Sequence, residues 1–292
     1  MAWDFELIGD GFSLTEGPAW DGSGLLFTDI NNSRVMRYDP ESGGITVFRE
    51  KTERTNGLMF DKDGRLYGCS QNRGAIVRFE PDGSMTTIAG EYEGMRLNSP
   101  NDLAIDDRGR IWFTDPRYDD LAPPAELEHM SVYRLDPGAG DEWEIERVTY
   151  DTTRPNGILI SPDQSELLVS QAGPTADEKR ELRAYPIRDT GVLGRPRVVH
   201  NFHPHRSIDG MCFDSNGHII AAAGNSAGGP GPMVYVFEQS GRILETHPTP
   251  VDSPTNVTFG GPDLSTLYLT TIGGHLFRAE ADRRGLLHFP NP

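Results

Sequence analysis

Six polar residues recur along the chain at the start of similar segments, and their side-chain oxygens could bind a metal ion. Each begins a short apolar run, a turn and a second apolar run, as in NDLAIDDRGRIWFTD from Asn101. The intervals between them are 40, 45, 55, 53 and 47 residues. The six are Glu16, Asn56, Asn101, Asn156, Asp209 and Asn256. Carboxylate and amide oxygens without Cys or His are the ligands that a hard cation such as Ca²⁺ prefers.

The segments that carry these residues predict repeated β-hairpins. After Asn101, residues 103–105 alternate like a short strand, 106–109 form a turn and 111–114 a more buried strand. Third strands follow, such as RVMRYD from Arg34, and weaker fourth strands, such as ITVFRE from Ile45. Four strands in a unit of roughly 40 to 50 residues are typical of propeller blades. We therefore predict an all-β, six-bladed β-propeller of four-stranded antiparallel blades over residues 1–292, with two stacked sandwiches as the alternative.

The N-terminal segment FELIG, residues 5–9, has no partner in the first unit. We expect it to pair with the last blade and close the ring, which would remove the free sheet edges between the first and last blades.

In a propeller the first strand of each blade lines the central channel, so the six residues, here called the ring residues, would converge at one rim. Carboxylates at positions 16 and 209 would repel each other in a narrow channel unless a cation neutralised them. We expect one divalent ion, Ca²⁺ first and Zn²⁺ or Mn²⁺ as alternatives. In a simpler interpretation, the ring residues only form hydrogen bonds to loops and to water in the channel. This explains why amides occur at these positions, but not why two acids do. Segments 116–130, 172–180 and 224–232 are expected to form a lid and walls over this rim.

Composition restricts the partners. The formal charge of −17 and the lack of a basic patch disfavour nucleic acid and anionic membranes, and favour a neutral or cationic small molecule or a metal ion. The start MAWDFELIGDGF has no leader pattern, and no run approaches the ~18 apolar residues of a membrane helix. We expect a soluble, cytoplasmic protein in which Cys69 and Cys212 are buried thiols. The oligomeric state stays open.

A set of motifs over nearly the whole chain resembles the SMP-30/gluconolactonase/luciferin-regenerating-enzyme family, and within it the bacterial gluconolactonase-like sugar lactonases. The motifs are LTEGPAW from Leu14, RLNSPNDL from Arg96, WFTDP from Trp112, RPNGI from Arg154, IDGM from Ile208 and TNVTFGG from Thr255. The resemblance implies a six-bladed propeller that holds a catalytic divalent metal, commonly Ca²⁺ or Zn²⁺. By motif match the ligands are Glu16, Asn156 and Asp209, with Asn101 as a further ligand or a substrate contact.

The same resemblance implies a metal-dependent hydrolase of lactones. A bound cation would polarise the carbonyl, and Asp209 would act either as the base for the attacking water or as a nucleophile. Arg96 and Asn98 match family positions that contact substrate, although a solvated loop arginine is the simpler interpretation of Arg96. Asn56 and Asn256 would line the pocket, and Tyr118 could touch substrate from the loop after the third blade's second strand.

Other residues near the motifs have simpler roles. His203 and His205 precede Asp209, and we interpret them as loop histidines rather than as catalytic bases. Asp29 and Asp115 follow second strands and are interpreted as turn formers. Trp20 and Trp112 are expected in the core between blades.

Three functions remain open. The first is a lactonase for a sugar or other polar lactone. The second is a phosphotriesterase-like enzyme or a hydrolase of hydrophobic lactones or esters, which the apolar residues of segment 116–130 would suit. The third is a protein-binding propeller with a structural metal, which two acids and four amides in one channel disfavour.

Overall fold

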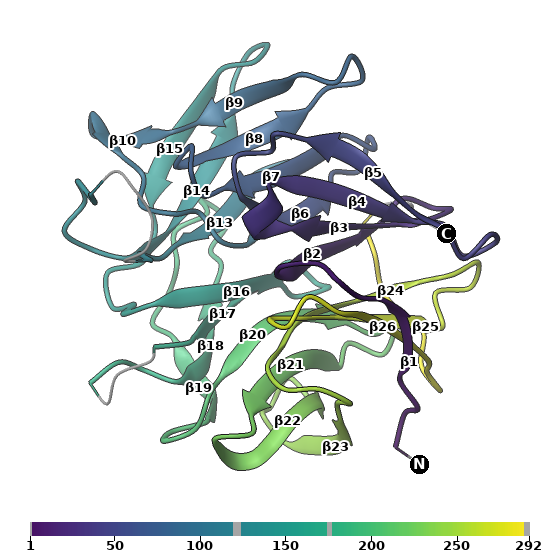
Figure 1. Cartoon of the computed structure of the whole chain (residues 1–292). Helices are drawn as coiled ribbons and strands as arrows, with labels where there is room; N and C mark the ends of the chain where they lie inside the picture. The colour runs from purple at the N-terminus through teal and green to yellow at the C-terminus, as the bar shows by residue number, and fades with distance from the viewer. Residues whose placement is uncertain (1, 119–123, 174–176, 289–292) are drawn as a thin grey trace.

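The computed structural model describes residues 2–118, 124–173 and 177–288, and it shows a ring of six four-stranded antiparallel sheets (Figure 1). The first strands of successive blades contact one another around the whole ring, so they form the channel wall. One short 3₁₀ helix, η1 (Ile30–Asn32), is the only helix in the described ranges. The predicted all-β six-bladed propeller is confirmed.

The strands of each blade, from the channel outwards, are as follows. The first blade contains β2 (Thr15–Trp20), β3 (Leu25–Asp29), β4 (Arg34–Tyr38) and β5 (Ile45–Glu50). The second contains β6 (Thr55–Phe60), β7 (Leu66–Ser70), β8 (Ala75–Phe79) and β9 (Met85–Ala89). The third contains β12 (Leu103–Ile105), β13 (Ile111–Asp115), β14 (Ser131–Pro137) and β15 (Trp143–Arg147). The fourth contains β16 (Pro155–Ile160), β17 (Glu166–Gln171), β18 (Glu181–Pro186) and β19 (Arg197–Asn201). The fifth contains β20 (Ile208–Phe213), β21 (Ile219–Asn225), β22 (Gly228–Phe237) and β23 (Ile243–Pro248).

The sixth blade joins the two ends of the chain. It contains β24 (Pro254–Gly260), β25 (Thr266–Thr271), β26 (Leu276–Glu280) and, as its outer strand, β1 (Glu6–Gly9) (Figure 1). The predicted closure by the N-terminal strand is therefore confirmed. Trp3 also holds the N-terminal segment against the fifth blade, because its ring stacks on that of His247 with 3.8 Å between the ring centroids.

Apolar side chains from adjacent blades form the core between the sheets. Trp112 of β13 is fully buried, and the guanidinium groups of Arg110 and Arg134 lie 5.2 and 5.4 Å from its ring. Trp20 is also buried, next to Tyr268 of the last blade. Cys69 and Cys212 are free and buried, as expected. This packing fixes each inner strand rigidly against its neighbours, which is what the channel residues need.

Five of the six inner strands have a β-bulge at or beside the ring residue. A bulge turns a side chain out of the normal alternation, so it can direct the ring residue toward the channel. The glycines that follow four ring residues let the inner strands approach closely. A Cβ on Gly157 would lie 2.2 Å from the carbonyl oxygen of Asp209, and one on Gly210 would lie 2.0 Å from Cγ of Asn256.

Two details differ from the predicted loops. Segment 224–232 is mostly strand rather than loop, because β21 and β22 extend and pair as far as Asn225 and Gly228. Glycines with positive φ at positions 224, 229 and 231 let the chain twist there without ending the hairpin. A small extra hairpin, β10 (Glu91–Tyr92) and β11 (Met95–Arg96), precedes the third blade.

The other two segments of the predicted lid, 116–130 and 172–180, lie partly outside the described residues. Within the described part of the chain, no helix has the length and apolar character needed to cross a membrane.

Candidate active site

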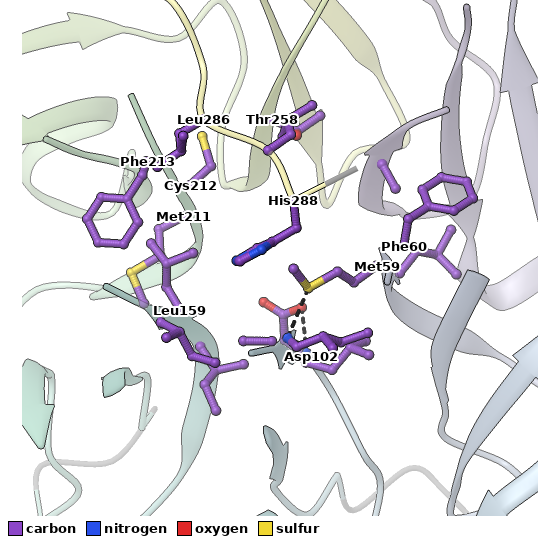
Figure 2. A pocket seen from close by; sticks show the side chains of 18 of the residues that line it. Met59, Phe60, Asp102, Leu159, Met211, Cys212, Phe213, Thr258, Leu286 and His288 are labelled. Carbon is purple, nitrogen blue, oxygen red and sulfur yellow. Dashed lines mark hydrogen bonds between the residues drawn. The ribbon is translucent and has the colours of Figure 1, made fainter. Parts of the chain in front are cut away.

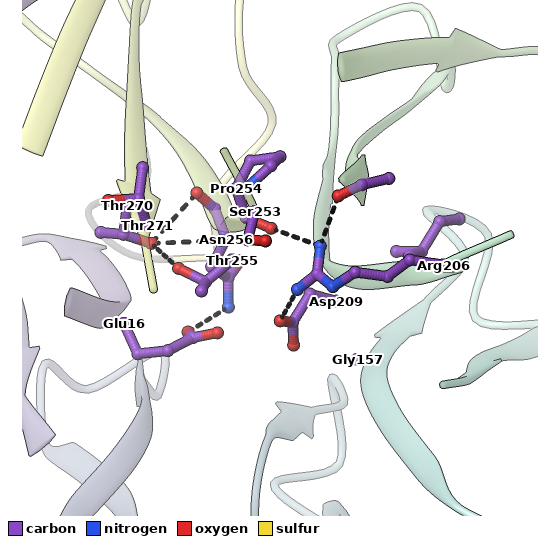
Figure 3. Close-up of polar contacts among 12 residues, drawn as sticks. Glu16, Gly157, Arg206, Asp209, Ser253, Pro254, Thr255, Asn256, Thr270 and Thr271 are labelled. Carbon is purple, nitrogen blue, oxygen red and sulfur yellow. Dashed lines mark hydrogen bonds and ion pairs between the residues drawn. The ribbon is translucent and has the colours of Figure 1, made fainter. Parts of the chain in front are cut away.

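Five of the six ring residues line one polar cavity of about 310 Å³ at the channel mouth: Glu16, Asn56, Asn101, Asn156 and Asp209. Asn256 lies beside them in the wall, where its Nδ2 donates to Oε2 of Glu16 over 3.0 Å (Figure 3). Its own Oδ1 accepts the backbone N–H of Val257. Both ends of the Asn256 amide are therefore bonded within the protein.

Side chains at the ends of second strands position the ring residues of three blades. Asp29 accepts a hydrogen bond from the backbone N–H of Ser13 over 3.0 Å, and Gln171 accepts one from that of Thr153 over 3.0 Å. Asp115 accepts the backbone N–H of Asn98 over 2.9 Å. The three donors lie three residues before Glu16, Asn156 and Asn101. Asp29 and Asp115, predicted as turn formers, thus fix the segments that lead into the ring.

Glu16 is a buried carboxylate, 5% exposed, at the centre of the acidic part of the ring. It accepts hydrogen bonds from the N–H of Gly17 and from Asn256, and it forms no ion pair with any described residue. Burial raises the pKa of Glu16 well above its usual range, and the negative charges of Asp209 and Asp102 raise it further. Bound positive charge would lower this cost.

Asp209 pairs with Arg206, a residue that the sequence reasoning missed. Nη2 of Arg206 donates to Oδ2 of Asp209 over 2.5 Å, and its Nη1 donates to the carbonyl oxygens of Gly224 and Pro254 (Figure 3). Burial raises the pKa of Asp209, although the charge of Arg206 and a hydrogen bond from Asn156 oppose that rise. The sequence does place Arg206 three residues before Asp209, and this short spacing is the signal that could have indicated the pair.

Tyr118, which we predict to contact substrate, lines the same cavity, and its hydroxyl accepts a hydrogen bond from Nδ2 of Asn101 over 2.6 Å. Burial raises the pKa of Tyr118 far above its usual value, with the charges of Asp209 and Glu16 adding to the rise. Its hydroxyl therefore keeps its proton at neutral pH and is available as a donor.

Arg96 and Asn98 are not among the residues that line the polar cavity. The Arg96 guanidinium donates to four backbone carbonyl groups, at residues 71, 72, 97 and 98. Nδ2 of Asn98 donates to Asp115 and to the carbonyl oxygen of His129, and Asn98 is buried. In this structure both side chains hold the loop before Asn101 in place.

A second, apolar cavity of about 230 Å³ lies further along the channel, lined by later residues of all six inner strands. Met59, Met211 and Phe213 form its walls, and His288, near the C-terminal end of the chain, faces Asp102 across it (Figure 2). Burial raises the pKa of Asp102 to about 7. The ring residues thus separate a polar mouth from an apolar interior.

The donor set fits a hard divalent cation. No three His, Cys, Asp or Glu side chains of the described residues cluster as a metal site, so amide oxygens would have to complete the coordination. Glu16 supplies a buried carboxylate that forms no ion pair with the residues the structure describes, and Asp209, Asn156 and Asn101 line the same cavity. The observation that argues for the fit is that two acids, Glu16 buried and Asp209 largely so, line one cavity, and that only Asp209 forms an ion pair among the described residues.

Comparisons with known proteins agree with this architecture. The profile of the SMP-30/Gluconolactonase/LRE-like region matches residues 14–273. The pentonolactonase XacC of Haloferax volcanii is 31% identical over 89% of this chain and 82% of its own length. A gluconolactonase of Zymomonas mobilis is 26% identical over 82% of this chain and 70% of its own.

A solved structure described as a gluconolactonase from Xanthomonas campestris superposes with a TM-score of 0.82 and 34% identity, over 95% of this chain and 89% of its own. The matched region includes all six ring residues and all six inner strands. The chain belongs to the SMP-30/gluconolactonase/LRE-like family.

Proposed function

We propose that this protein is a metal-dependent lactonase that opens a sugar or related lactone to the hydroxy acid. The observation that carries the proposal is the pair of carboxylates, Glu16 buried and Asp209 with its side chain only 14% exposed, among amides at one mouth of the channel. Relatives named for activity on gluconolactone and pentonolactone support the substrate class.

Glu16, Asn156 and Asp209 would hold the cation, with Asn101 as a fourth ligand or a substrate contact. Ca²⁺ suits these oxygen donors best, and Zn²⁺ or Mn²⁺ could replace it in vitro. When bound, the divalent ion supplies Lewis-acid polarisation of the lactone carbonyl.

Asp209 has the central role among the protein's own groups. Its carboxylate would either take a proton from the attacking water or attack the carbonyl itself and form an acyl-enzyme. Arg206 holds one of its oxygens, which fixes the orientation of the carboxylate. Tyr118, bonded to Asn101, would donate a hydrogen bond to a substrate oxygen.

A second candidate is a hydrolase of more apolar lactones, esters or phosphotriesters at the same site. The observation that favours it is the presence of Leu14, Ile30 and Ile272 in the wall of the polar cavity. A protein-binding propeller with a structural metal is the third, and it predicts metal binding without turnover.

Metal binding can be tested apart from activity by calorimetric titration of the metal-stripped protein with Ca²⁺. We expect one site in the wild type and its loss in Glu16→Gln, which keeps the shape of the side chain but removes the charge. Equal Ca²⁺ binding by both proteins would contradict this assignment.

A further inference from the structure

A third cavity, of about 390 Å³, adjoins the polar cavity and shares Ala172, Arg206 and Ser207 with it. Its lining includes three side chains that carry or can carry positive charge: Arg180, His205 and Arg206. Among the described residues that line it there is no Asp or Glu. We call this cavity the basic subsite.

The basic subsite has the opposite sign to the protein as a whole. The chain carries a formal charge of −17, which by itself favours a neutral or cationic partner. Long-range charge is screened by salt within about 10 Å, so the groups that line a cavity decide what binds there. The local lining favours an anion.

The two guanidinium groups are held by backbone carbonyls. Nε of Arg180 donates to the carbonyl oxygen of Gly173 over 3.0 Å, and its Nη1 contacts that of Pro204. Nη1 of Arg206 donates to Gly224 and Pro254 in the same way, while its Nη2 is paired with Asp209. Carbonyl groups fix the direction of a guanidinium without cancelling its charge, so Arg180, beside His205, is the guanidinium prepared for an oxyanion. The carboxylate of Glu178, which packs over Gly173, is paired with Arg154 over 3.1 Å.

Two further features suit a ligand. The ring of His205 packs against the backbone of Gly229, which has no side chain. A Cβ at that position would lie 2.8 Å from the ring. The hydroxyl of Ser207 is buried and has no hydrogen-bond partner in the described structure, and Ser207 lines both cavities. A buried hydroxyl without a partner carries a free-energy cost that a ligand oxygen could remove.

We propose that the basic subsite binds an anionic group on the substrate, so that the lactone carries a carboxylate or a similarly compact oxyanion away from the ester being cleaved. This inference rests on the proposed function, because it extends the site at which the lactone is opened. The ester carbonyl would lie beside Asp209, and the anionic group beside Arg180 and His205.

The test compares two lactones that differ mainly in one group. D-glucono-1,4-lactone carries a neutral hydroxymethyl group where D-glucaro-1,4-lactone carries a carboxylate. We expect the wild type to favour the carboxylate form by at least tenfold in kcat/KM. We expect Arg180→Gln to reduce this ratio about tenfold and Arg180→Lys to reduce it less. The control is Arg195→Gln, an exposed arginine in the β18–β19 connection at the other end of the same blade, which should leave the ratio unchanged.

Equal kcat/KM for the two lactones, or an unchanged ratio in Arg180→Gln, would overturn the inference while leaving a lactonase in place. Binding of D-glucarate, measured by calorimetry, separates the two failures. Glucarate binding that depends on Arg180, in a protein that opens neither lactone, would keep the anion subsite and overturn the proposed reaction. Absence of both glucarate binding and turnover would overturn both.

Discussion

Arg206 donates a hydrogen bond through Nη2 to Oδ2 of Asp209 over 2.5 Å, and the Asp209 side chain is only 14% exposed. The pair places a fixed positive charge in direct contact with one of the two acids at the channel mouth, while Glu16 faces the same cavity and forms no ion pair within the described ranges. The arrangement gives the two carboxylates different environments, which is how two acids of the same type acquire different roles.

Arg206→Gln should destabilise the metal-stripped protein by about 1–3 kcal/mol, because it leaves the Asp209 carboxylate buried without its cation. Added Ca²⁺ should reduce this loss, since the ion would replace the missing charge. Urea unfolding with EDTA and with Ca²⁺ measures both effects. Arg242→Gln, at an exposed arginine paired with Glu238, is the control and should change little. A Ca²⁺-independent loss would contradict a shared role of the ion and Arg206 at Asp209.

Asp209→Asn should lower kcat by about 10²- to 10⁴-fold while the protein stays folded, because the amide can neither accept a proton nor attack the carbonyl. Circular dichroism and the melting temperature check the fold. Asp252→Asn, at an exposed acid bonded to Ser226, should keep full activity. If Asp209→Asn retained near-normal turnover, Asp209 would have no chemical role.

Asp29→Asn should destabilise the protein at neutral pH by about 2–3 kcal/mol. Burial raises the pKa of Asp29, but hydrogen bonds from Arg34, Asn32 and Ser13 outweigh it and lower the pKa below the usual value. A lowered pKa stabilises the fold above the unfolded value of about 3.9, and the contribution is lost as pH falls through the folded pKa.

The difference between wild type and Asp29→Asn in urea unfolding should therefore be largest near pH 7 and shrink toward pH 3. Asp10→Asn, at an exposed acid near the same end of the chain, should show little difference at any pH. A difference in unfolding free energy that grows as the pH falls would contradict a lowered pKa for Asp29.

Gly210→Ala should destabilise the protein by about 2 kcal/mol or more, since the added methyl would lie 2.0 Å from Cγ of Asn256. Gly90→Ala is the matched control, because the nearest atom to its Cβ would be 3.6 Å away. Thermal unfolding of both variants measures the effect. Equal stability would mean that close approach of the inner strands is not required at Gly210.

Much of the fold could be predicted from the sequence because each blade repeats the same local pattern of strand, turn and strand. The six ring residues stand at one position of that repeat, so the repeat alone predicts that they converge. The closing strand β1 was predictable because FELIG had no partner in its own unit.

The rest depended on contacts between residues distant in the chain or on backbone detail. Arg206 reaches Gly224 and Pro254, 18 and 48 residues away, and no local pattern records those bonds. The bulges that direct the ring residues depend on strand register. The basic subsite was hidden by the overall negative charge, since counting charges over the chain averages out a local group of cations.

The most direct test of the central claim is a pH-stat assay of metal-stripped protein against sugar, aliphatic and aromatic lactones, with and without Ca²⁺, Zn²⁺ or Mn²⁺. Paraoxon is included for the phosphotriesterase alternative, and spontaneous opening is subtracted. We predict acid release from sugar lactones that requires added metal and disappears in Asp209→Asn. Metal-independent release, or no release from any lactone by folded protein that binds Ca²⁺, would contradict a metal-dependent lactonase.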